Sequence, residues 1–520
     1  MEPVPVGVVP APLALRRPDG SAGEQSDDQS DDGGFVVVSS ASPVEVGPGA
    51  QGGAAVLRRL LRAQRPGDDA NADLTPPPGP APAPVRLALT ADLPAPVPQP
   101  APPGAYHLRV TAGGVDLRAV DEAGLRHGLV TLRQLAGHGT GHRYGHGDGD
   151  TWVVRPVEVL DAPRFGWRGL SLDVARHFLP VAGVVAVLDA LEDLKLDVLH
   201  LHLTDDQGWR LEVPSRPALV ERSGPTAVDG DPGGWYSVEE WRGLVAQAAE
   251  RGVRLVPEID LPGHVNAALH ALGELTPSGE PATAYTGIGV GFSRLHADLP
   301  ATGAFLRDVL TDVAALTEGP HVHLGGDEVL TMDASEYELL VRTAADVLRA
   351  AGRTPVAWQE AASAGLGPDA VLQVWDLRQD MGPVRAAAAS GAGVVLSPAS
   401  RVYLDMKYDA ATRLGLEWAG HVPLAQAYDW EPLAVVPGLD PARVLGVEAA
   451  LWSETTRSLD DVTELLLPRL AAVAEVAWSA PDRRDPDDFL RRVVGLAPGW
   501  DRAGLRWHRA AGAQWDGSQE

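Results

Sequence analysis

The fold is decided by the stretch Val181-Ala-Gly-Val-Val-Ala-Val-Leu-Asp-Ala-Leu-Glu-Asp-Leu-Lys195, which is followed after one residue by Asp197-Val-Leu-His-Leu-His-Leu-Thr204. In the first segment the valine and leucine side chains recur three or four residues apart, which predicts a helix with one apolar face. The second segment is a short, mainly apolar run with the length of a buried strand. A helix that leads into such a strand is typical of a repeating α/β domain.

Outward from this stretch, the alternation of strands and helices continues from about residue 160 onward. Apolar runs predict eight strands, at Gly169–Val174, Asp197–Thr204, Val253–Ile259, His321–Leu324, Pro355–Trp358, Val371–Trp375, Gly393–Ser397 and Leu445–Leu451. Amphipathic segments predict helices at Val181–Lys195, Val238–Arg251, Gly303–Leu316, Ser335–Ala351 and Asp461–Trp478. Eight strands in about 290 residues favour a closed (β/α)8 TIM barrel. A doubly wound open sheet is the alternative fold, but the sequence contains no glycine-rich turn for a dinucleotide.

The first 150 residues differ in pattern and predict a small α+β domain. Strands are predicted at Phe35–Ser39, Val85–Thr90, Tyr106–Thr111 and Val115–Ala119, and helices at Ala54–Arg62 and Asp121–Leu135. The last two strands flank Ala112-Gly113-Gly114, which indicates a hairpin. Residues 18–34, rich in Asp, Ser and Gly, are expected to form a surface loop. We therefore expect an N-terminal accessory domain at 1–150 and a barrel domain at 151–520.

The composition excludes several classes of protein. The 520 residues include 43 basic and 70 acidic side chains, a net charge of −27, so the chain lacks the basic surface of a nucleic-acid-binding protein. There is no cysteine, which excludes disulfides, a cysteine nucleophile and thiolate metal ligands. No run approaches the ~20 apolar residues that span a bilayer, so no membrane partner is expected. Prolines interrupt Met1–Leu15, which does not resemble a signal peptide, and we expect a cytoplasmic protein. The sequence does not indicate an oligomeric state.

Polar side chains gather where the predicted strands end, which is where a barrel of this kind carries its functional groups. In chain order the eight ends carry Asp173 and Arg176; Asp205 and Asp206; Glu258, Asp260 and His264; Asp327 and Glu328; Trp358 and Glu360; Trp375 and Asp376; Tyr403 and Asp405; Trp452 and Glu454. Carboxylates that bind hydroxyls, and indoles that pack on the C–H face of a pyranose, are the components of a sugar site. The 14 Trp against 6 Phe agree with this interpretation, since an ordinary core favours Phe.

Each of these features also has an ordinary structural explanation. An acidic pair such as Asp205-Asp206 is common in turns and helix caps. Gly325-Gly326 is compatible with a tight turn, and His264 with a capping or buried histidine. The joint placement of these groups at strand ends favours a functional site, because the ordinary explanations do not predict it.

Four motifs together resemble the family 20 glycoside hydrolases, the β-N-acetylhexosaminidases. They are Asp173-Val-Ala-Arg-His-Phe178, His200-Leu-His-Leu-Thr-Asp-Asp-Gln-Gly-Trp209, Glu258-Ile-Asp-Leu-Pro-Gly-His264 and, the most specific, His323-Leu-Gly-Gly-Asp-Glu328. The resemblance extends to the hairpin and helix at 105–135 and so covers nearly the whole chain. It implies a retaining, exo-acting enzyme that removes terminal β-linked GlcNAc or GalNAc from a glycan and uses no cofactor.

The Asp327-Glu328 pair bears on the mechanism. In most retaining glycosidases two carboxylates flank the scissile bond, about 5–5.5 Å apart. Sequence neighbours, with Cα atoms ~3.8 Å apart, are better placed to act on one side of the substrate. The resemblance implies that the acetamide oxygen of the substrate is the nucleophile and forms an oxazolinium ion. Glu328 is then the general acid, Asp327 accepts the acetamide N–H, and Tyr403 donates to the acetamide oxygen. Asp205 and His264 are implied to support Glu328.

The resemblance also implies how the sugar is held. Trp358, Trp375 and Trp452 are assigned to the wall of the acetyl pocket, Arg176, Asp405 and Glu454 to the sugar hydroxyls, Trp418 to a further substrate contact, and Asp260 to a supporting role. Independently, the irregular segment around Tyr285–Phe292 is expected to contribute a loop to the site.

Two other functions compete with this one. The pairs His200/His202 and His321/His323 lie on predicted strands, so each pair shares one face and offers the edge of a metal site. A metal-dependent hydrolase barrel is therefore the first alternative. The second is a non-catalytic carbohydrate-binding protein, which the presence of both Asp327 and Glu328 disfavours. Disaccharide release and transglycosylation are variants of the same chemistry, decided by loops beyond the first sugar.

Overall fold

The computed structural model describes residues 8–17, 35–62, 81–136 and 151–515. The chain divides into two compact units. Unit 1 consists of Met1–Gly166, Asp193–Lys195 and Ala474–Glu520, and unit 2 of Trp167–Glu192 and Leu196–Val473. The division thus falls 16 residues beyond the boundary expected at residue 150, and the C-terminal segment is grouped with unit 1.

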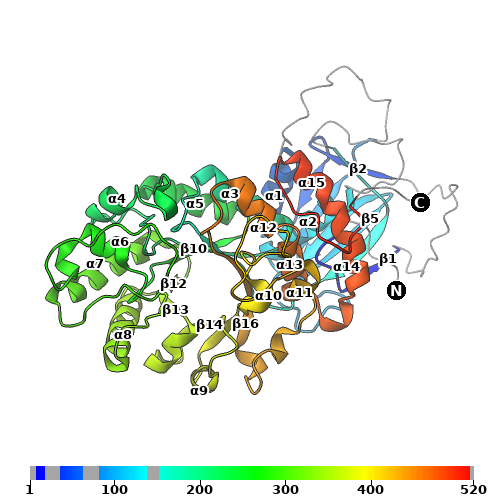
Figure 1. Cartoon of the computed structure of the whole chain (residues 1–520). Coiled ribbons are helices and arrows are strands. Elements are labelled where there is room, and N and C mark those ends of the chain that lie inside the picture. Colours follow the sequence, from blue (N-terminus) through cyan, green and yellow to red (C-terminus); the bar gives the residue numbers. More distant parts are fainter. Residues whose placement is uncertain (1–7, 18–34, 63–80, 137–150, 516–520) are drawn as a thin grey trace. The chain divides into compact units, whose positions relative to one another are not determined.

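Unit 2 is a closed barrel of eight parallel strands in the order β10-β11-β12-β13-β14-β15-β16-β9. The strands are β9 (Trp167–Asp173), β10 (Val198–His202), β11 (Arg254–Glu258), β12 (His321–His323), β13 (Thr354–Trp358), β14 (Val371–Val374), β15 (Gly393–Leu396) and β16 (Val444–Leu451). All eight predicted strands and the predicted barrel are confirmed. The strands are almost entirely buried, because helices cover the outside of the ring, as Figure 1 shows.

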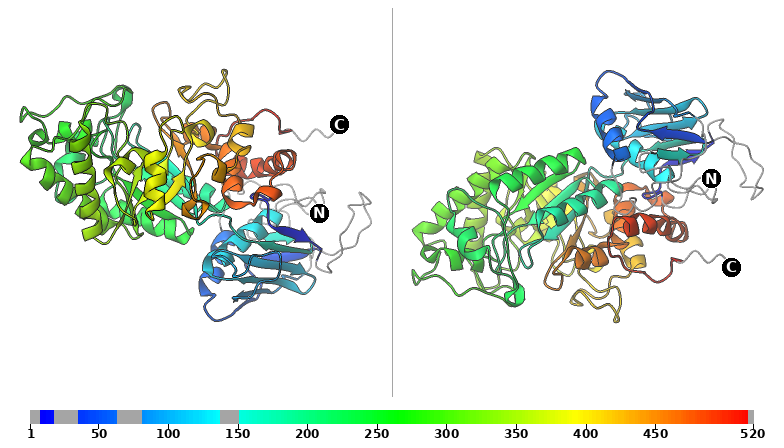
Figure 2. Two further views of the ribbon diagram at one scale, coloured as in Figure 1. Left: turned by 90° about the horizontal axis from the view of Figure 1, so that it is seen from below. Right: turned by 90° about the horizontal axis from the view of Figure 1, so that it is seen from above.

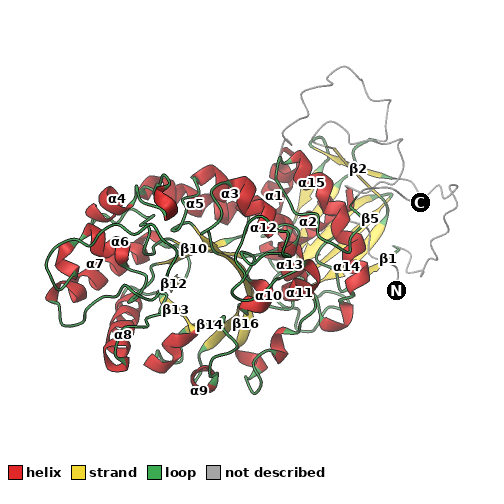
Figure 3. Cartoon of the chain, viewed as in Figure 1, coloured by secondary structure: helices red, strands yellow, loops and turns green. Residues whose placement is uncertain are grey.

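The helices of unit 2 mostly follow the strands, and Figure 3 shows them in red around the strands. They are α3 (Val181–Asp193), α4 (Ala218–Ser223), α5 (Val238–Glu250), α6 (Asn266–Ala271), α7 (Pro300–Leu316), α8 (Ala334–Ala350), α9 (Gly382–Ala389), α10 (Ala399–Val402), α11 (Leu424–Tyr428) and α12 (Leu459–Leu466). One prediction is wrong in detail. The helix predicted at Asp461–Trp478 is two helices, α12 and α13 (Arg469–Trp478), since Pro468 lacks an N–H and disfavours helical geometry at Leu467.

The barrel interior is layered, because alternate residues of a strand face the same side. An apolar layer at the amino ends of the strands is formed by Trp167, Val198, Val256, Val356, Val371 and Val395. Two residues further along the same strands lies a polar layer, which comprises His200, Glu258, Trp358 and Gln373 together with Glu448 of β16. The polar layer is fully buried and forms the floor beneath the carboxyl ends of the strands.

Unit 1 contains a six-stranded sheet in the order β1-β8-β5-β6-β4-β3 and a separate pair, β2-β7. Its elements are β1 (Ala14–Arg16), β2 (Val36–Ser39), β3 (Val44–Val46), α1 (Gln51–Arg62), β4 (Val85–Leu89), β5 (Tyr106–Thr111), β6 (Gly114–Ala119), α2 (Glu122–Ala136), β7 (Thr151–Val154), β8 (Val157–Asp161), α14 (Pro486–Val493) and α15 (Ala497–Arg502). The predicted hairpin is confirmed by the antiparallel β5–β6 pairing. In Figure 2 the sheet appears in blue and cyan with α1 and α2 beside it.

The sequence did not predict four strands of unit 1, namely β1, β3, β7 and β8. Each has only three to five residues, too few for a clear alternation of apolar and polar side chains. The loop expected at 18–34 lies outside the described residues. Among the residues that the structure describes, no helix is long and apolar enough to cross a membrane.

Candidate active site

The turn after β12 presents the acidic pair, and its geometry requires glycine. Gly325 has φ = 70°, and a Cβ atom there would lie 1.7 Å from Oδ1 of Asp260. Gly326 donates its N–H to the same Asp260 oxygen over 3.1 Å and accepts a hydrogen bond of 2.5 Å from the hydroxyl of Tyr337 on α8. The turn is therefore held from two sides, which gives Asp260 its supporting position.

Asp327 and Glu328 follow this turn, and both line one cavity. The Asp327 side chain is 12% exposed and that of Glu328 is 32% exposed. Glu328 has φ = 51°, a left-handed conformation that is uncommon for a non-glycine residue. Burial raises the pKa of Asp327 well above its usual value, and the negative charges of Asp260 and Glu328 raise it further. A positive charge in the cavity would oppose this rise, because it favours the ionised carboxylate.

His264 lies directly behind the acidic pair. Its Nε2 is 3.5 Å from Oε2 of Glu328 and 3.9 Å from Oδ2 of Asp327. Its Nδ1 faces Oδ1 of Asp205 at 3.2 Å. Burial alone would lower the pKa of His264, but Asp205 raises it well above the usual value. The ring thus links Asp205 to the acidic pair, and the supporting role of Asp205 and His264 stays a prediction.

An aromatic wall borders the same cavity. The rings of Trp375 and Tyr403 are stacked at 14° with centroids 6.3 Å apart, and Trp418 meets both edge-on. Trp452 packs against Tyr403 at 6.0 Å. These four side chains line a cavity of about 230 Å³, and Ile288 and Val290 of the segment expected to form a loop line it too. The sequence assigned the four aromatic residues to this site.

Trp358 is placed differently from Trp375 and Trp452, the other two tryptophans assigned to the acetyl pocket. It is fully buried and does not line the cavity, and its Nε1 donates to Oε1 of Glu258 over 2.9 Å. It supports the wall from below, because its ring lies 5.9 Å from that of Trp452. The prediction of direct substrate contact for Trp358 therefore has no support from this geometry.

The polar groups assigned to the sugar hydroxyls are not separate from the aromatic wall, because Arg176 lies 5.1 Å from the ring centroid of Trp452 beside the cavity. Arg176 lines it and pairs through Nη2 with Oδ2 of Asp205 at 2.9 Å. Glu454 also lines it. Neither carboxylate oxygen of Asp405 has a hydrogen-bond partner among the described residues, and burial together with Glu454 raises its pKa well above the usual value. An unpartnered buried carboxylate is costly, which is typical of a site that awaits a donor from a ligand.

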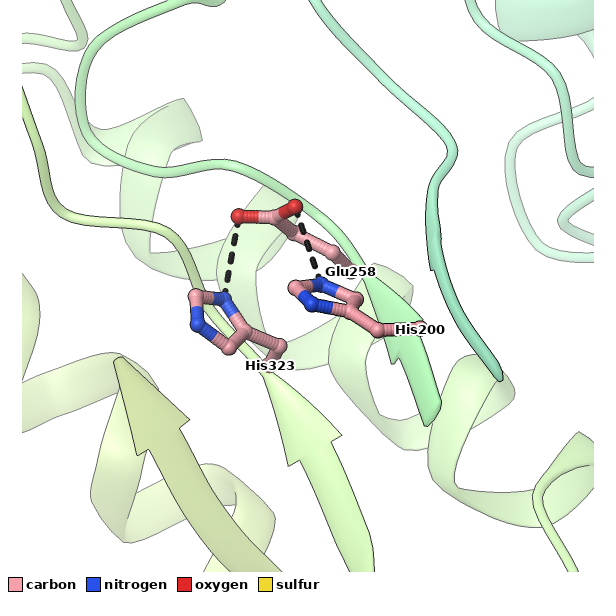
Figure 4. Close-up of side chains that lie close together, drawn as sticks. All are labelled: His200, Glu258 and His323. Atoms are coloured by element: carbon pink, nitrogen blue, oxygen red, sulfur yellow. Dashed lines mark ion pairs between the residues drawn. The ribbon is translucent and has the colours of Figure 1, made fainter. Parts of the chain in front are cut away.

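Three of the histidines considered as metal ligands gather around one carboxylate, and His200, Glu258 and His323 form a group that could hold a metal ion. Figure 4 shows Glu258 between two of them, with its Oε2 3.0 Å from Nε2 of His200 and its Oε1 3.0 Å from Nδ1 of His323. His202 reaches the same carboxylate through Nδ1 at 2.6 Å. His321 lies apart from them and packs on the ring of Trp167. The three histidines thus surround the carboxylate of Glu258, and Nδ1 of His323 also accepts from the N–H of Gly325 at 3.0 Å.

Several residues of the site had no role in the sequence-based prediction. Glu360 accepts the indole N–H of Trp375 at 3.2 Å and so orients that ring. Burial, together with the charge of Asp327, raises the pKa of Glu360 to about 7. Arg378 and Leu416 also line the cavity. Glu360 was noted at a strand end without a role, and Arg378 and Leu416 were not singled out, since their sequence neighbourhood matches no motif.

A parallel barrel that carries paired acids, a supporting histidine and a tryptophan wall at the carboxyl ends of its strands defines a glycoside hydrolase. Residues 165–339 and 333–481 match the profile described as "Glycosyl hydrolase family 20, catalytic domain", and residues 27–162 match "Glycosyl hydrolase family 20, domain 2". The chain belongs to glycosyl hydrolase family 20. This confirms the resemblance seen in the sequence.

Individual relatives agree with the family. A β-N-acetylhexosaminidase of Cellulomonas fimi is 57% identical over 413 residues, which cover 79% of this chain and 82% of that protein. The structure of the GH20 β-N-acetylhexosaminidase from Streptomyces coelicolor has a TM-score of 0.85 and 35% identity, and the match covers 99% of this chain and 100% of that one. A mutant Streptomyces plicatus β-hexosaminidase in complex with the product GlcNAc matches with the same score and identity, over 99% of both chains.

Proposed function

We propose that the chain is a retaining exo-β-N-acetylhexosaminidase, which hydrolyses terminal β-linked GlcNAc or GalNAc from the non-reducing end of glycans. The names of the relatives and the GlcNAc complex of the Streptomyces plicatus homologue support this activity. Family 20 enzymes are substrate-assisted exceptions to the two-carboxylate rule of glycosidases. The observation that carries the proposal is that Asp327 and Glu328 are consecutive residues of one turn and both line the cavity.

Two of the other cavity carboxylates, Asp205 and Asp260, are held by contacts with the protein, which disfavours them as an enzymic nucleophile. Both oxygens of Asp205 are occupied, by His264 on one side and by Arg176 and His202 on the other. Oδ1 of Asp260 is used by the backbone turn. A nucleophile from the substrate itself therefore fits this site better than one from the protein.

The first chemical step breaks the glycosidic bond. The acetamide oxygen attacks the anomeric carbon while Glu328 gives its proton to the leaving oxygen, and a cyclic oxazolinium ion forms. Asp327 accepts the acetamide N–H and stabilises the positive charge that develops on the ring. Tyr403 donates its hydroxyl to the acetamide oxygen and aligns it for attack, while Trp375 packs against the acetyl group.

The second step restores the acetamide. Glu328, now ionised, takes a proton from a water molecule that attacks the anomeric carbon on the face the leaving group has vacated. The bond from the acetamide oxygen to the anomeric carbon breaks, so two inversions give overall retention. Arg176, Asp405 and Glu454 bind hydroxyls of the terminal sugar and close the cavity at its non-reducing end, which makes the enzyme exo-acting.

A pair of chromogenic substrates tests this proposal. We expect kcat/KM for 4-nitrophenyl N-acetyl-β-glucosaminide to exceed that for 4-nitrophenyl β-glucoside by at least about 10³-fold, because the glucoside lacks the intramolecular nucleophile. The assay is run with EDTA, and full activity is expected, because the mechanism uses no metal. Similar rates on the two substrates, or loss of activity after chelation, would contradict the proposal; the second result would favour the metal-dependent alternative.

A further inference from the structure

A group of buried side chains beneath the cavity has no part in the steps above. The Glu258 carboxylate, at the end of β11, is fully buried within the polar layer. It accepts from Nδ1 of His202 at 2.6 Å and from the indole of Trp358 at 2.9 Å, and it pairs with His200 and His323 at 3.0 Å each (Figure 4). Burial alone would raise the pKa of Glu258, but the histidines lower it well below its usual value. The Glu258 carboxylate thus accepts from His202 and Trp358, whereas Nδ1 of His323 itself accepts from the N–H of Gly325 at 3.0 Å.

His202 is held between this anion and a second one. Its Nδ1 faces Glu258, and its Nε2 lies 2.8 Å from Oδ2 of Asp205. An ionised carboxylate only accepts hydrogen bonds, so two ionised neighbours favour a ring that donates from both nitrogens, an imidazolium ion, while Nη1 of Arg176 also approaches Nε2 at 3.4 Å. Burial alone would lower the pKa of His202, but Glu258 and Asp205 together raise it well above the usual value. The charge of His202 thus depends on both neighbours.

The contacts continue from His202 to the general acid. Oδ1 of Asp205 meets Nδ1 of His264 at 3.2 Å, and Nε2 of His264 lies 3.5 Å from Oε2 of Glu328. Carboxylates and imidazoles therefore alternate along Glu258–His202–Asp205–His264–Glu328, a series we name the relay chain. His202 lines the cavity, whereas Glu258 lies below it, so the positive end of the Glu258–His202 pair faces the substrate.

We propose that Glu258 and His202 are positioning residues, which act without touching the substrate. They hold Asp205 against His264 and place a fixed positive charge beside the cavity. In this way they set the proton affinity of Glu328. This inference rests on the proposed function, since it gives Glu328 the role of acid. Other charged groups among the described residues also face the relay chain. They are Arg176 after β9, Asp206 after β10, Asp260 after β11 and Asp327 after β12. His200 and His323 face Glu258.

The test replaces Glu258 by glutamine, which keeps the shape of the side chain. The new amide can donate to Nδ1 of His202, so the ring becomes neutral and donates only to Asp205. The cavity then loses a positive charge, which favours the protonated form of Glu328. In Glu258→Gln we expect the basic limb of the kcat/KM profile to move to higher pH by about 0.5–1 unit. We expect the maximum to fall about 10-fold, as is usual when a supporting residue is lost.

Glu448→Gln is the matched control. Glu448 is equally buried in the polar layer, but it accepts from His200, Trp167 and Gln373 and does not contact His202. We expect its pH profile to match that of the wild type. The inference would be overturned if the basic limb of the kcat/KM profile did not move in Glu258→Gln, or if it moved equally in Glu258→Gln and Glu448→Gln. His202→Gln removes the cation but leaves Glu258 ionised, so we expect an upward shift at least as large; if Glu258→Gln does not fold, an unmoved limb in His202→Gln overturns the inference.

A spectroscopic measurement decides the charge of His202 directly. In protein with ¹⁵N-labelled histidine, both ring nitrogens of His202 are expected to carry protons from about pH 5 to about pH 8, a range in which an ordinary histidine loses one. The signals are assigned by their absence in His202→Gln. One of the two protons should be lost in Glu258→Gln and both kept in Glu448→Gln, and any other pattern overturns the inference. This measurement does not use catalysis, so it separates failure of the relay chain from failure of the proposed function.

Discussion

Replacement of Glu328 by glutamine is expected to lower kcat/KM by about 10³-fold on chitobiose or an alkyl β-N-acetylglucosaminide, within the range of about 10²–10⁴ that a general acid contributes. An alkoxide is a poor leaving group and leaves only with a proton, which glutamine cannot provide. A 2,4-dinitrophenolate needs no proton to leave, so its glycosylation step is expected to slow by less than about 10-fold. Steady-state and burst-phase kinetics on both substrates check this prediction.

Glu338→Gln serves as the control for this variant, because Glu338 lies on the exposed side of α8, where it pairs with Arg342. Its activity is expected to equal that of the wild type. In Glu328→Gln, added azide should speed turnover of the dinitrophenyl substrate, since an anionic nucleophile needs no general base to attack the oxazolinium ion. Equal losses on both substrate classes, with no response to azide, would remove Glu328 from the acid–base role.

Replacement of Asp327 by asparagine is expected to lower kcat/KM by about 10²–10³-fold on activated and unactivated substrates alike. The asparagine oxygen still accepts the acetamide N–H, but the negative charge that stabilises the oxazolinium ion is gone. Because leaving-group protonation is not affected, the loss should not depend on the leaving group. This pattern distinguishes Asp327 from Glu328, and wild-type rates in Asp327→Asn would contradict the assigned role.

The same variant is expected to be more stable than the wild type at neutral pH. Asp327 has a raised pKa in the folded protein, so it binds its proton more tightly there than in the unfolded chain. Its contribution to stability is therefore unfavourable above the pKa of the unfolded state, about 4, and grows as the pH rises toward the folded-state value. Asparagine removes this contribution, so the Tm should rise by a few degrees at pH 7 and change little near pH 4, which scanning calorimetry measures.

Local patterns in the sequence predicted the barrel well. The eight strands are short apolar runs, and the motifs at their ends place acids and indoles on one rim regardless of how the helices pack. The helix break at Pro468 was visible in the sequence, yet the apolar spacing on both sides of it favoured one long helix. The short strands of unit 1 depend on pairing with distant partners, which no local pattern reveals.

The sequence named most of the residues that line the cavity, but it did not indicate which of the buried side chains beneath the cavity contact one another. Glu258 and His202 are 56 residues apart in the chain, and only strand pairing brings them into contact. The resemblance assigned Trp358 to the acetyl pocket, whereas its position two residues beyond Val356 puts it in the buried polar layer. The cytoplasmic location stays a prediction, as do the roles of the individual site residues.

The central claim is that the acetamide of the substrate is the nucleophile. The most direct test is to change the electron density on the acetamide oxygen and to measure how kcat/KM responds. In a series of 4-nitrophenyl β-glucosaminides that carry N-acetyl, N-fluoroacetyl, N-difluoroacetyl and N-trifluoroacetyl groups, each fluorine makes the amide oxygen a weaker nucleophile. We expect kcat/KM to fall steadily and by more than about 100-fold across the series, which corresponds to about 2.7 kcal/mol in the activation free energy. A flat series would show that the amide oxygen takes no part in bond breaking, which would contradict substrate-assisted catalysis by this enzyme.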